Sequence, residues 1–170
     1  MSKIYLSGRE IIFEGAEILF GSFRNFRGEK RKYNDAGKRN FNAKVEADNI
    51  AFLVEQGVNV KYFKADAEDE DQDDMDGFVK VNVNYDSYKK PEVFVRYGEK
   101  GKFVELNENS IEKLDSAVFD YVDMILNPYR RDETSNASLY LNKGYFTIHV
   151  DPLAAKYENS EDIEEEELPF

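Results

Sequence analysis

The side chains best suited to bind a ligand lie between Phe23 and Lys44, where cationic residues are interleaved with aromatic rings. The cations are Arg24, Arg27, Lys30, Arg31, Lys32, Lys38, Arg39 and Lys44, and the rings are Phe23, Phe26, Tyr33 and Phe41. Unpaired bases stack on aromatic rings, a contact worth about 1–3 kcal/mol per base, while cations pair with the phosphates. Because a duplex hides the faces of its bases, this segment predicts a surface for single-stranded nucleic acid.

A structural interpretation of the same segment stays open. Phe23, Phe26 and Phe41 could instead be core residues beside a solvated, charged loop. Further contacts to single-stranded nucleic acid are expected at Lys61, Lys80, Tyr129, Arg130 and Arg131. Binding through stacking and charge should tolerate every base and weaken with added salt.

Catalytic chemistry finds little support in the residue types. The chain has no cysteine, which excludes disulfides, thiolate zinc sites and a cysteine nucleophile. The single histidine, His149, falls in a predicted strand without a local nucleophile motif, and we interpret it as structural. The segment Gly98-Glu99-Lys100-Gly101-Lys102 lacks the glycine spacing and the Ser/Thr of a phosphate-binding loop. We therefore predict no enzyme activity, no catalytic residue and no cofactor.

The net charge of −12 at pH 7 argues at first against a nucleic-acid partner. Two segments without a basic residue hold many of the acids, eight in Asp66–Asp76 and seven in Glu158–Phe170. Removing these fifteen charges from −12 leaves the rest of the chain at +3, so a mildly basic body carries two acidic appendages. A calcium loop in the first segment would need acids where Gln72 and Val83 stand, so we predict a solvated loop without a metal there.

The C-terminus joins a run of acids to an apolar tip. Its last residues are Glu164, Glu165, Glu166, Glu167, Leu168, Pro169 and Phe170. This terminus resembles that of single-stranded DNA-binding proteins of bacteria and their phages, in which acids precede a small apolar tip closing on Pro-Phe. The resemblance implies that these residues bind partner proteins. We predict a flexible acidic tail at residues 153–170 behind a domain of residues 1–152.

Strand signals dominate the rest of the chain, because apolar and polar residues alternate in segments such as Val79-Lys80-Val81-Asn82-Val83. We predict strands at Glu10–Phe20, Arg39–Glu46, Val58–Lys64, Phe78–Tyr85, Glu92–Tyr97, Ala117–Leu126 and Ser138–Val150. Short helices are predicted at Asp48–Gln56, capped by Asp48 and ended by Gly57, and from a Ser110 cap to Ser116. This pattern favours a mainly β fold, an OB-fold-like antiparallel barrel whose first binding loop holds the basic segment.

A longer resemblance covers roughly residues 1–150. The chain is similar to a family of single-stranded DNA-binding proteins encoded by tailed bacteriophages. The similarity rests on Asn25-Phe26-Arg27-Gly28, Tyr33-Asn34, Gly37, Arg39–Phe41, Gly57-Val58-Asn59-Val60-Lys61, Val79-Lys80-Val81, Val122-Asp123 and Asn127-Pro128-Tyr129. It implies an oligonucleotide-binding barrel, coating of a strand without catalysis, and contacts of the tail with replication or recombination proteins. One departure is Arg130-Arg131, where the family pattern has an aromatic residue soon after Pro128-Tyr129.

We therefore expect a protein that coats and protects single-stranded DNA during phage replication, recombination or repair, as a monomer or a homo-oligomer. Without a bilayer-length apolar run or a signal peptide, the bacterial cytoplasm is the expected location. The alternative is an acidic DNA mimic or interaction protein that binds a DNA-processing protein. A mimic should spread its acids over the folded surface, whereas here they are segregated. A structural β protein of a virion is a third possibility.

Overall fold

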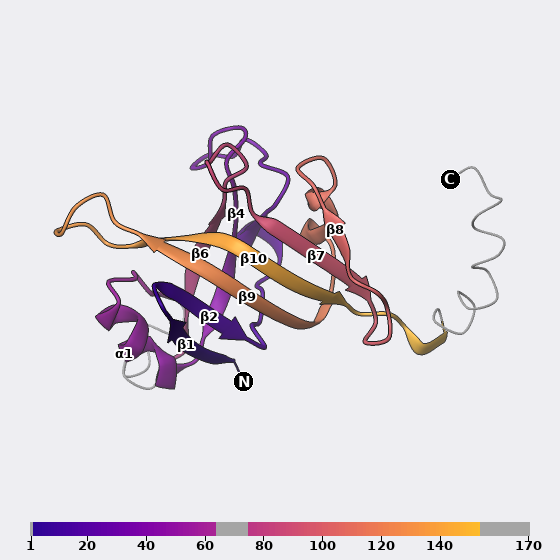
Figure 1. Ribbon diagram of the computed structural model, residues 1–170, viewed down its shortest axis with the longest axis horizontal. Helices are drawn as coiled ribbons and strands as arrows, with labels where there is room; N and C mark the ends of the chain where they lie inside the picture. The colour runs from indigo at the N-terminus through magenta and orange to yellow at the C-terminus, as the bar shows by residue number, and fades with distance from the viewer. Residues whose placement is uncertain (1, 64–74, 154–170) are drawn as a thin grey trace.

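The computed structural model describes residues 2–63 and 75–153 (Figure 1). Most of the acidic segment Asp66–Asp76 lies outside these residues. The prediction that this segment is a solvated loop without a bound metal therefore also falls outside the described residues. The tail beyond residue 153, with the predicted partner-binding residues Glu164–Phe170, also lies outside them. Among the helices that the structure describes, none has the length and apolar composition needed to cross a bilayer.

Strands make up most of the ordered elements, so the mainly β prediction is confirmed. The elements are β1 (Lys3–Ser7), β2 (Glu10–Glu14), η1 (Gly21–Phe23), β3 (Arg24–Asn25), β4 (Arg39–Val45), α1 (Ala47–Glu55), β5 (Lys61–Tyr62), β6 (Gly77–Val83), β7 (Glu92–Tyr97), β8 (Val104–Leu106), η3 (Ile111–Asp115), β9 (Phe119–Tyr129) and β10 (Ser138–Ile148). Each predicted strand corresponds to one of β2, β4, β5, β6, β7, β9 and β10. The short strands β1, β3 and β8 were not predicted.

Strand β10 organises the sheet because it pairs with three other strands. It is antiparallel to β9, parallel to β6 at Leu139 and Tyr140, and parallel to β7 from Lys143 to Ile148. The register to β9 shifts between Leu141 and Lys143, where β10 passes from one parallel partner to the other, and such a shift bends a strand. The sequence did not indicate the two parallel pairings, since the alternation of a half-buried strand is the same in either direction.

The paired strands follow the order β1-β2-β9-β10-β6-β4-β3, which leaves a gap between β9 and β4 on the side of β2. Residues 16–19, which follow β2, bridge this gap with backbone hydrogen bonds. The Ala16 amide donates to the Val122 carbonyl at 2.8 Å, and the Leu19 amide donates to the Asn42 carbonyl at 2.9 Å. The core is thus surrounded by an incomplete barrel, which agrees with the predicted OB-fold-like architecture.

The core fills the inside of this curved sheet. Alternation places Val79, Val81 and Val83 of β6 inside, while the residues between them face outward. The rings of Phe26 and Phe41 stack at a centroid distance of 4.8 Å, and Phe146 meets both edge-on. The outward positions of the same strands are therefore free to carry a binding surface.

The helix α1 begins one residue earlier than predicted. Glu46 holds the N-cap position, and Asp48 lies in the first turn, so the predicted capping by Asp48 is wrong. The Ala47 amide instead donates to the Asp76 carboxylate at 2.9 Å, which satisfies a helix-end donor from a distant segment. Gly57 has a φ of 82° and ends the helix as predicted. The predicted second helix is the 3-10 helix η3, and Ser110 forms no side-chain cap there.

Candidate nucleic-acid interface

Three of the residues predicted to contact a nucleic acid are buried, which corrects the prediction for them. Phe26 and Phe41 are 0% exposed and pack in the core, and Arg24 is 1% exposed. Phe41 stands at an inward position of β4 and Phe26 in the turn after β3, and burial of such large apolar side chains is favoured whatever their neighbours are. For Phe26 and Phe41, the structural interpretation left open above is therefore the correct one.

Arg24 is buried because backbone carbonyls and rings satisfy its guanidinium group. Its Nε donates to the Leu19 carbonyl at 2.7 Å, and its Nη1 donates to the carbonyls of Leu114 and Ala117 at 2.9 and 2.6 Å. The rings of Phe20 and Phe119 lie 4.3 and 4.7 Å from its Cζ. Burial lowers the pKa of Arg24 to about 10. Arg24 therefore ties the segment before β3 to η3 and β9 instead of meeting a phosphate.

Several other predicted cations are partly engaged within the protein. Arg39 Nη1 donates to the Arg27 carbonyl at 2.8 Å. Arg27 forms a 3.3 Å ion pair with Glu112, Arg31 a 3.8 Å pair with Glu29, and Lys44 pairs with Glu17 at 3.8 Å and with Asp76 at 3.6 Å. Exposed pairs of this kind contribute about 0–1 kcal/mol, so a phosphate could compete for Arg27 and Arg31. Arg39, with its side chain 16% exposed, serves mainly to hold the loop.

The loop between β3 and β4 owes its shape to two asparagines. The Asn25 side-chain nitrogen donates to the Glu29 carbonyl, and the Glu29 amide donates to the Asn25 side-chain oxygen, both at 2.8 Å. The Asn34 side-chain nitrogen donates to the carbonyls of Glu29, Asp35 and Lys38 at 2.9 to 3.1 Å. These contacts fix the backbone from Gly28 to Lys38, which we call the basic loop, so that its cations are held in place before any ligand arrives.

The side chains that this loop presents to solvent are the ones that a strand could reach. Lys30, Lys32 and Lys38 are exposed, and Tyr33 is 89% exposed. The Lys32 ammonium group lies 5.3 Å from the centre of the Tyr33 ring. A protruding ring beside cations is the combination that single-stranded nucleic acid requires. The structure thus brings Tyr33 and these lysines together on the surface, as the sequence predicted.

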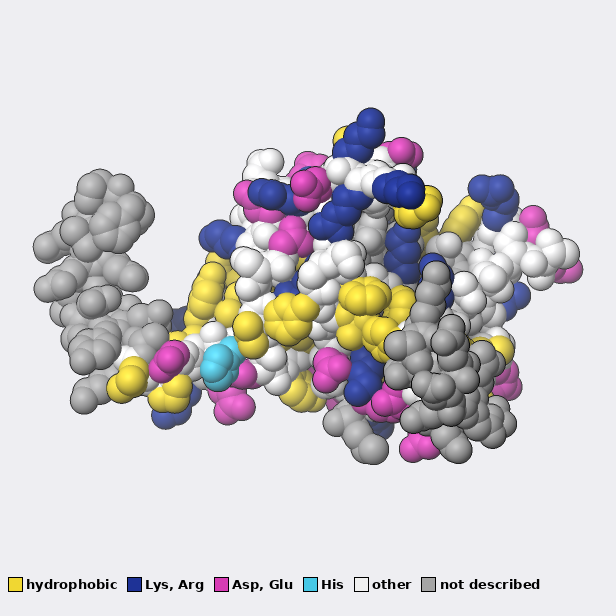
Figure 2. Space-filling model, turned by 180° about the vertical axis from the view of Figure 1, so that it is seen from behind, with side chains coloured by type: hydrophobic (Ala, Val, Ile, Leu, Met, Phe, Trp, Pro, Cys, Tyr) yellow, Lys and Arg dark blue, Asp and Glu magenta, His cyan; other side chains and the backbone are white. Residues whose placement is uncertain are grey.

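A second group of rings lies around the start of β6. Phe23, Phe63 and Phe78, the phenylalanine cluster, have ring centroids 4.9 to 5.9 Å apart. With Lys61 and Tyr62 they line an apolar depression of about 430 Å³. All three rings are partly exposed. Figure 2 views the molecule from behind, and apolar side chains gather in the middle of that face with both basic and acidic side chains around them. Phe23 and Lys61 therefore share a surface, as predicted.

The outward side chains of β6 connect this cluster to the rest of the surface. They are Phe78, Lys80 and Asn82, and Asn84 continues the same alternation just after the strand. Asn82 has Asn40 of β4 on one side and Tyr140 of β10 on the other, and Tyr140 is in turn opposite Asn127 of β9. We call Asn40, Asn82, Tyr140 and Asn127 the cross-strand row. Lys80, a predicted contact, is exposed beside this row.

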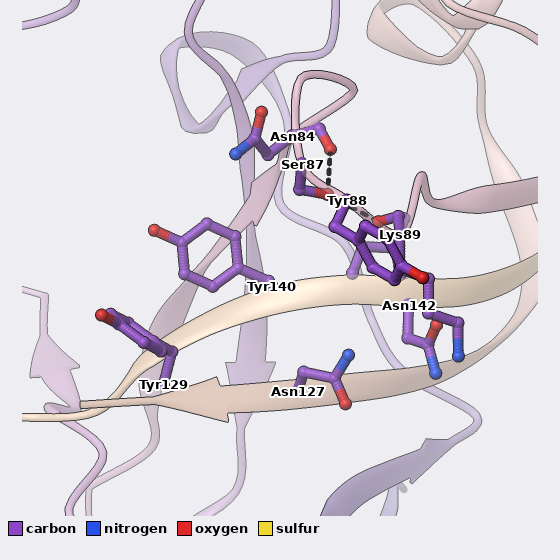
Figure 3. A pocket seen from close by; sticks show the side chains of 9 residues that line it. Asn84, Ser87, Tyr88, Lys89, Asn127, Tyr129, Tyr140 and Asn142 are labelled. Atoms are coloured by element: carbon purple, nitrogen blue, oxygen red, sulfur yellow. Dashed lines mark hydrogen bonds between the residues drawn. The ribbon is translucent and has the colours of Figure 1, made fainter. Parts of the chain in front are cut away.

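Beyond the row lies the tyrosine pocket, a cavity of about 420 Å³ (Figure 3). Its lining residues are Asn84, Ser87, Tyr88, Lys89, Asn127, Tyr129, Tyr140, Leu141 and Asn142. Tyr129 and Tyr140 stand on one side of the cavity and Tyr88 on the other. Tyr88 is fully exposed, Tyr129 is 61% exposed, and the rings of Tyr129 and Tyr140 meet edge-on at 6.4 Å. An adjoining hollow lined by Lys38, Arg39 and Asn82 joins the pocket to the basic loop.

The β9–β10 hairpin forms one wall of this region and projects to the left in Figure 1. Tyr129, predicted as a contact, is the last residue of β9 beside the hairpin loop and lines the tyrosine pocket. Arg131 is exposed, whereas the Arg130 Nη2 donates to the Gln56 carbonyl at 3.1 Å and anchors the hairpin beside α1. Of the predicted extension, Tyr129 therefore lines the tyrosine pocket, and Arg131 is exposed in the hairpin loop.

Tyr88, Lys89, Tyr140 and the asparagines of this face were not predicted from the sequence. A signal for Tyr88 was present, since Tyr88-Lys89-Lys90 occupies a turn between two strands, where an aromatic ring has no core to enter. The asparagines stand at polar positions of alternating strands, but their alignment depends on register, which the sequence does not specify.

Side chains that could bind a metal ion do not cluster in the described part of the chain. Residues 2–63 and 75–153 contain no group of three or more His, Cys, Asp or Glu side chains placed to hold a metal ion. The His149 Nδ1 lies 2.7 Å from the Asp120 carboxylate on the surface at the end of β10. His149 and Asp120 therefore form an exposed side-chain pair, with 50% and 39% of their side chains accessible.

Comparison with known proteins gives one family. The family model described as "Putative phage ssDNA-binding domain" matches residues 1–169. No curated protein matches the chain. Among solved structures, the single-stranded DNA-binding protein from bacteriophage Enc34 in complex with ssDNA is 12% identical, with a TM-score of 0.49, over 86% of this chain and 90% of that chain. A C-terminal truncation of the Enc34 protein is 11% identical, with a TM-score of 0.48, over the same shares.

Proposed function

Because the chain belongs to the family of phage ssDNA-binding domains, we propose that it coats single-stranded DNA along one continuous path on its outer surface. The path runs from the phenylalanine cluster along the outward side of β6 to the tyrosine pocket, and the basic loop lies beside it. Coating would protect the strand during phage DNA replication, recombination or repair. The protein would act by binding alone, without chemistry on the DNA.

The observation that carries this path is the outward face of β6. From Phe78 to Asn84 the chain covers about 20 Å at the usual rise per residue of a strand. Rings stand at both ends of this distance, Lys80 lies between them, and the alternating positions hold no acid. Rings that contact separate bases, with cations beside the phosphates, favour an extended strand whose bases are unpaired.

Charge distribution supports the same path. Lys30, Lys32 and Lys38 lie on the basic loop, and Lys89 lies at the tyrosine pocket, so cations stand on both sides of the cross-strand row. Among the residues that line the hollow between the basic loop and the tyrosine pocket, Asp86 is the acid. Because phosphates supply most of the binding energy at low salt, affinity should fall steeply as salt is added.

Fluorescence anisotropy with labelled oligo-dT and a duplex of equal length, over a series of salt concentrations, tests this proposal. We expect selective capture of the single strand, with an affinity that decreases with salt. The triple variant Lys30→Glu, Lys32→Glu, Lys38→Glu should lose most of this affinity, whereas Lys100→Glu, in the turn after β7, should not. Equal affinity for strand and duplex, or full affinity in the triple variant, would contradict the proposal.

We further propose that the terminal residues Glu164–Phe170 recruit replication or recombination proteins in the bacterial host cytoplasm. The proposal is supported by their sequence, in which acids precede the apolar tip. Leu168 and Phe170 would enter an apolar pocket of the partner, and the acids would meet its basic residues. Deleting the last thirteen residues should abolish capture of such a partner and tighten strand binding at low salt. Unchanged behaviour in both assays would refute this role.

A further inference from the structure

We infer that the asparagine side chains on the outer face of β4, β6, β9 and β10 hydrogen-bond the edges of unpaired bases, so that binding depends on base edges as well as base faces. This inference rests on the proposed path. Stacking and charge alone would require only the rings and the cations. The asparagines form an additional polar surface between them.

The placement of these residues is the first observation. Asn40, Asn82, Tyr140 and Asn127 are successive partners across four neighbouring strands, and they form the cross-strand row. Two further asparagines, Asn84 and Asn142, line the tyrosine pocket together with Asn127 (Figure 3). In a sheet, such neighbours stand about 5 Å apart. A base that stacks on Tyr140 would therefore have amide groups within reach on both sides.

The residue type is the second observation. Asparagine is depleted in β-strands, where threonine, valine and aromatic residues are favoured. It nevertheless occupies the outward positions of four adjoining strands, at Asn40 and Asn42 of β4, Asn82 of β6, Asn127 of β9 and Asn142 of β10. Sheet stability alone would not select this residue repeatedly at one face, and charged residues would suffice for solubility.

The chemistry of the amide group explains the selection. An asparagine both donates and accepts hydrogen bonds, whereas lysine only donates and an ionised acid only accepts. Each unpaired base also presents donors, acceptors or both on its Watson–Crick edge. Because one amide carries a donor and an acceptor side by side, the asparagines would strengthen binding to every base without selecting one. That behaviour suits a protein that coats DNA of any sequence.

The existing contacts of these asparagines engage part of each amide. Asn42 and Asn142 each donate one hydrogen, to the Phe23 carbonyl and the Glu10 carboxylate, and the Asn84 oxygen accepts from the Asp86 amide. The Asn40 nitrogen donates to the Asn34 side-chain oxygen at 2.9 Å, and the Asn82 nitrogen donates to the Leu139 carbonyl at 3.2 Å. Each of these bonds uses one hydrogen, while an amide has two hydrogens and an acceptor oxygen. The bonds hold the side chains in place, and Asn82 and Asn127 remain partly exposed.

Oligonucleotides whose bases stack but cannot form hydrogen bonds test the inference. In one oligo-dT, the central thymines are replaced by 2,4-difluorotoluene, an apolar mimic of the same shape. We expect wild-type protein to bind this mimic about 5- to 10-fold more weakly than thymine, as the loss of one or two hydrogen bonds predicts. The variants Asn82→Leu and Asn127→Leu should bind thymine more weakly and the mimic as before, so that the ratio approaches one.

Asn59→Leu serves as the matched control and should keep the wild-type ratio, because Asn59 is exposed and lines neither the tyrosine pocket, the adjoining hollow nor the apolar depression. Thermal unfolding of each variant confirms that it is folded. Equal wild-type affinity for thymine and mimic would overturn the inference and leave the proposed path intact. Equal weakening of both ligands by Asn82→Leu and Asn127→Leu would also overturn it. Absence of any strand binding by wild-type protein would instead refute the proposed function.

Discussion

Replacing Tyr88 with alanine should weaken binding to single-stranded DNA without weakening the fold. Tyr88 lies in the loop between β6 and β7 at the rim of the tyrosine pocket, and its side chain is fully exposed. A side chain that packs against nothing contributes little to folding. We therefore expect the free energy of unfolding to change by less than about 0.5 kcal/mol.

The size of the binding effect follows from stacking. A base stacked on an aromatic ring contributes about 1–3 kcal/mol, and a contact on one face of an exposed ring belongs in the lower part of this range. A loss of about 1–2 kcal/mol corresponds to a Kd raised about 5- to 30-fold. Tyr88→Phe keeps the ring and should keep most of the affinity, because stacking does not require the hydroxyl group.

Anisotropy titrations with labelled oligo-dT at fixed salt measure this effect, and thermal unfolding checks the fold. Tyr97→Ala is the matched control, since Tyr97 is also exposed, at 56%, but lies at the end of β7 outside the residues that line the pockets. It should bind as wild type does. If Tyr88→Ala changes Kd by less than twofold, or if Tyr97→Ala weakens binding as much, the tyrosine pocket is not part of the path.

Three further predictions test other parts of the structure. Replacing Lys30, Lys32 and Lys38 with glutamate should reduce the slope of log affinity against log salt concentration by about 2, since each phosphate contact on single-stranded DNA contributes about 0.7. An unchanged slope, measured by anisotropy, would show that the DNA does not contact these lysines. Arg24→Met should destabilise the fold by about 2 kcal/mol or more, because the carbonyls of Ile18, Leu19, Leu114 and Ala117 would all lose a donor. Denaturant unfolding measures this, and an unchanged stability would show that the buried contacts contribute nothing. Tyr85→Phe should leave stability at neutral pH unchanged or raised, because the buried Tyr85 hydroxyl has no partner among the described residues. Burial raises the pKa of Tyr85 to about 12, so folded wild-type protein keeps a proton that the unfolded chain releases from about pH 10, and its stability should fall between these values. Denaturant unfolding from pH 8 to 12 should show a smaller fall in Tyr85→Phe, and equal falls would contradict the assignment.

Much of the secondary structure was predictable because alternation marks each strand locally. The inward positions Val79, Val81 and Val83 follow from the period of two, and so does the outward position of Lys80. The end of α1 followed from Gly57, whose positive φ suits glycine. The start of α1 did not follow, because its first amide meets Asp76, a residue distant in the sequence.

The candidate site was predictable only in part. The sequence indicated that cations and rings of the basic segment act together, and Tyr33 and the lysines of the basic loop do lie together on the surface. It did not separate Tyr33 from Phe26, because a ring between cations looks the same in the sequence whether the folded loop turns it inward or outward. Arg24 shows the same limit for a cation. Its burial depends on the carbonyls of Leu19, Leu114 and Ala117, which come from distant parts of the sequence and meet only in the fold.

The sequence by itself determined that the protein has a mainly β body with a basic aromatic segment. Composition, charge segregation and alternation are local properties, so they can be read without the fold. Only the tertiary structure decided which side chains share a surface. The cross-strand row joins Asn40, Asn82, Tyr140 and Asn127 from four strands, and a shift of one residue in any pairing would turn a member of the row toward the core. Register is set by packing and hydrogen bonds across the whole sheet, so a surface built from it exists only once the chain has folded.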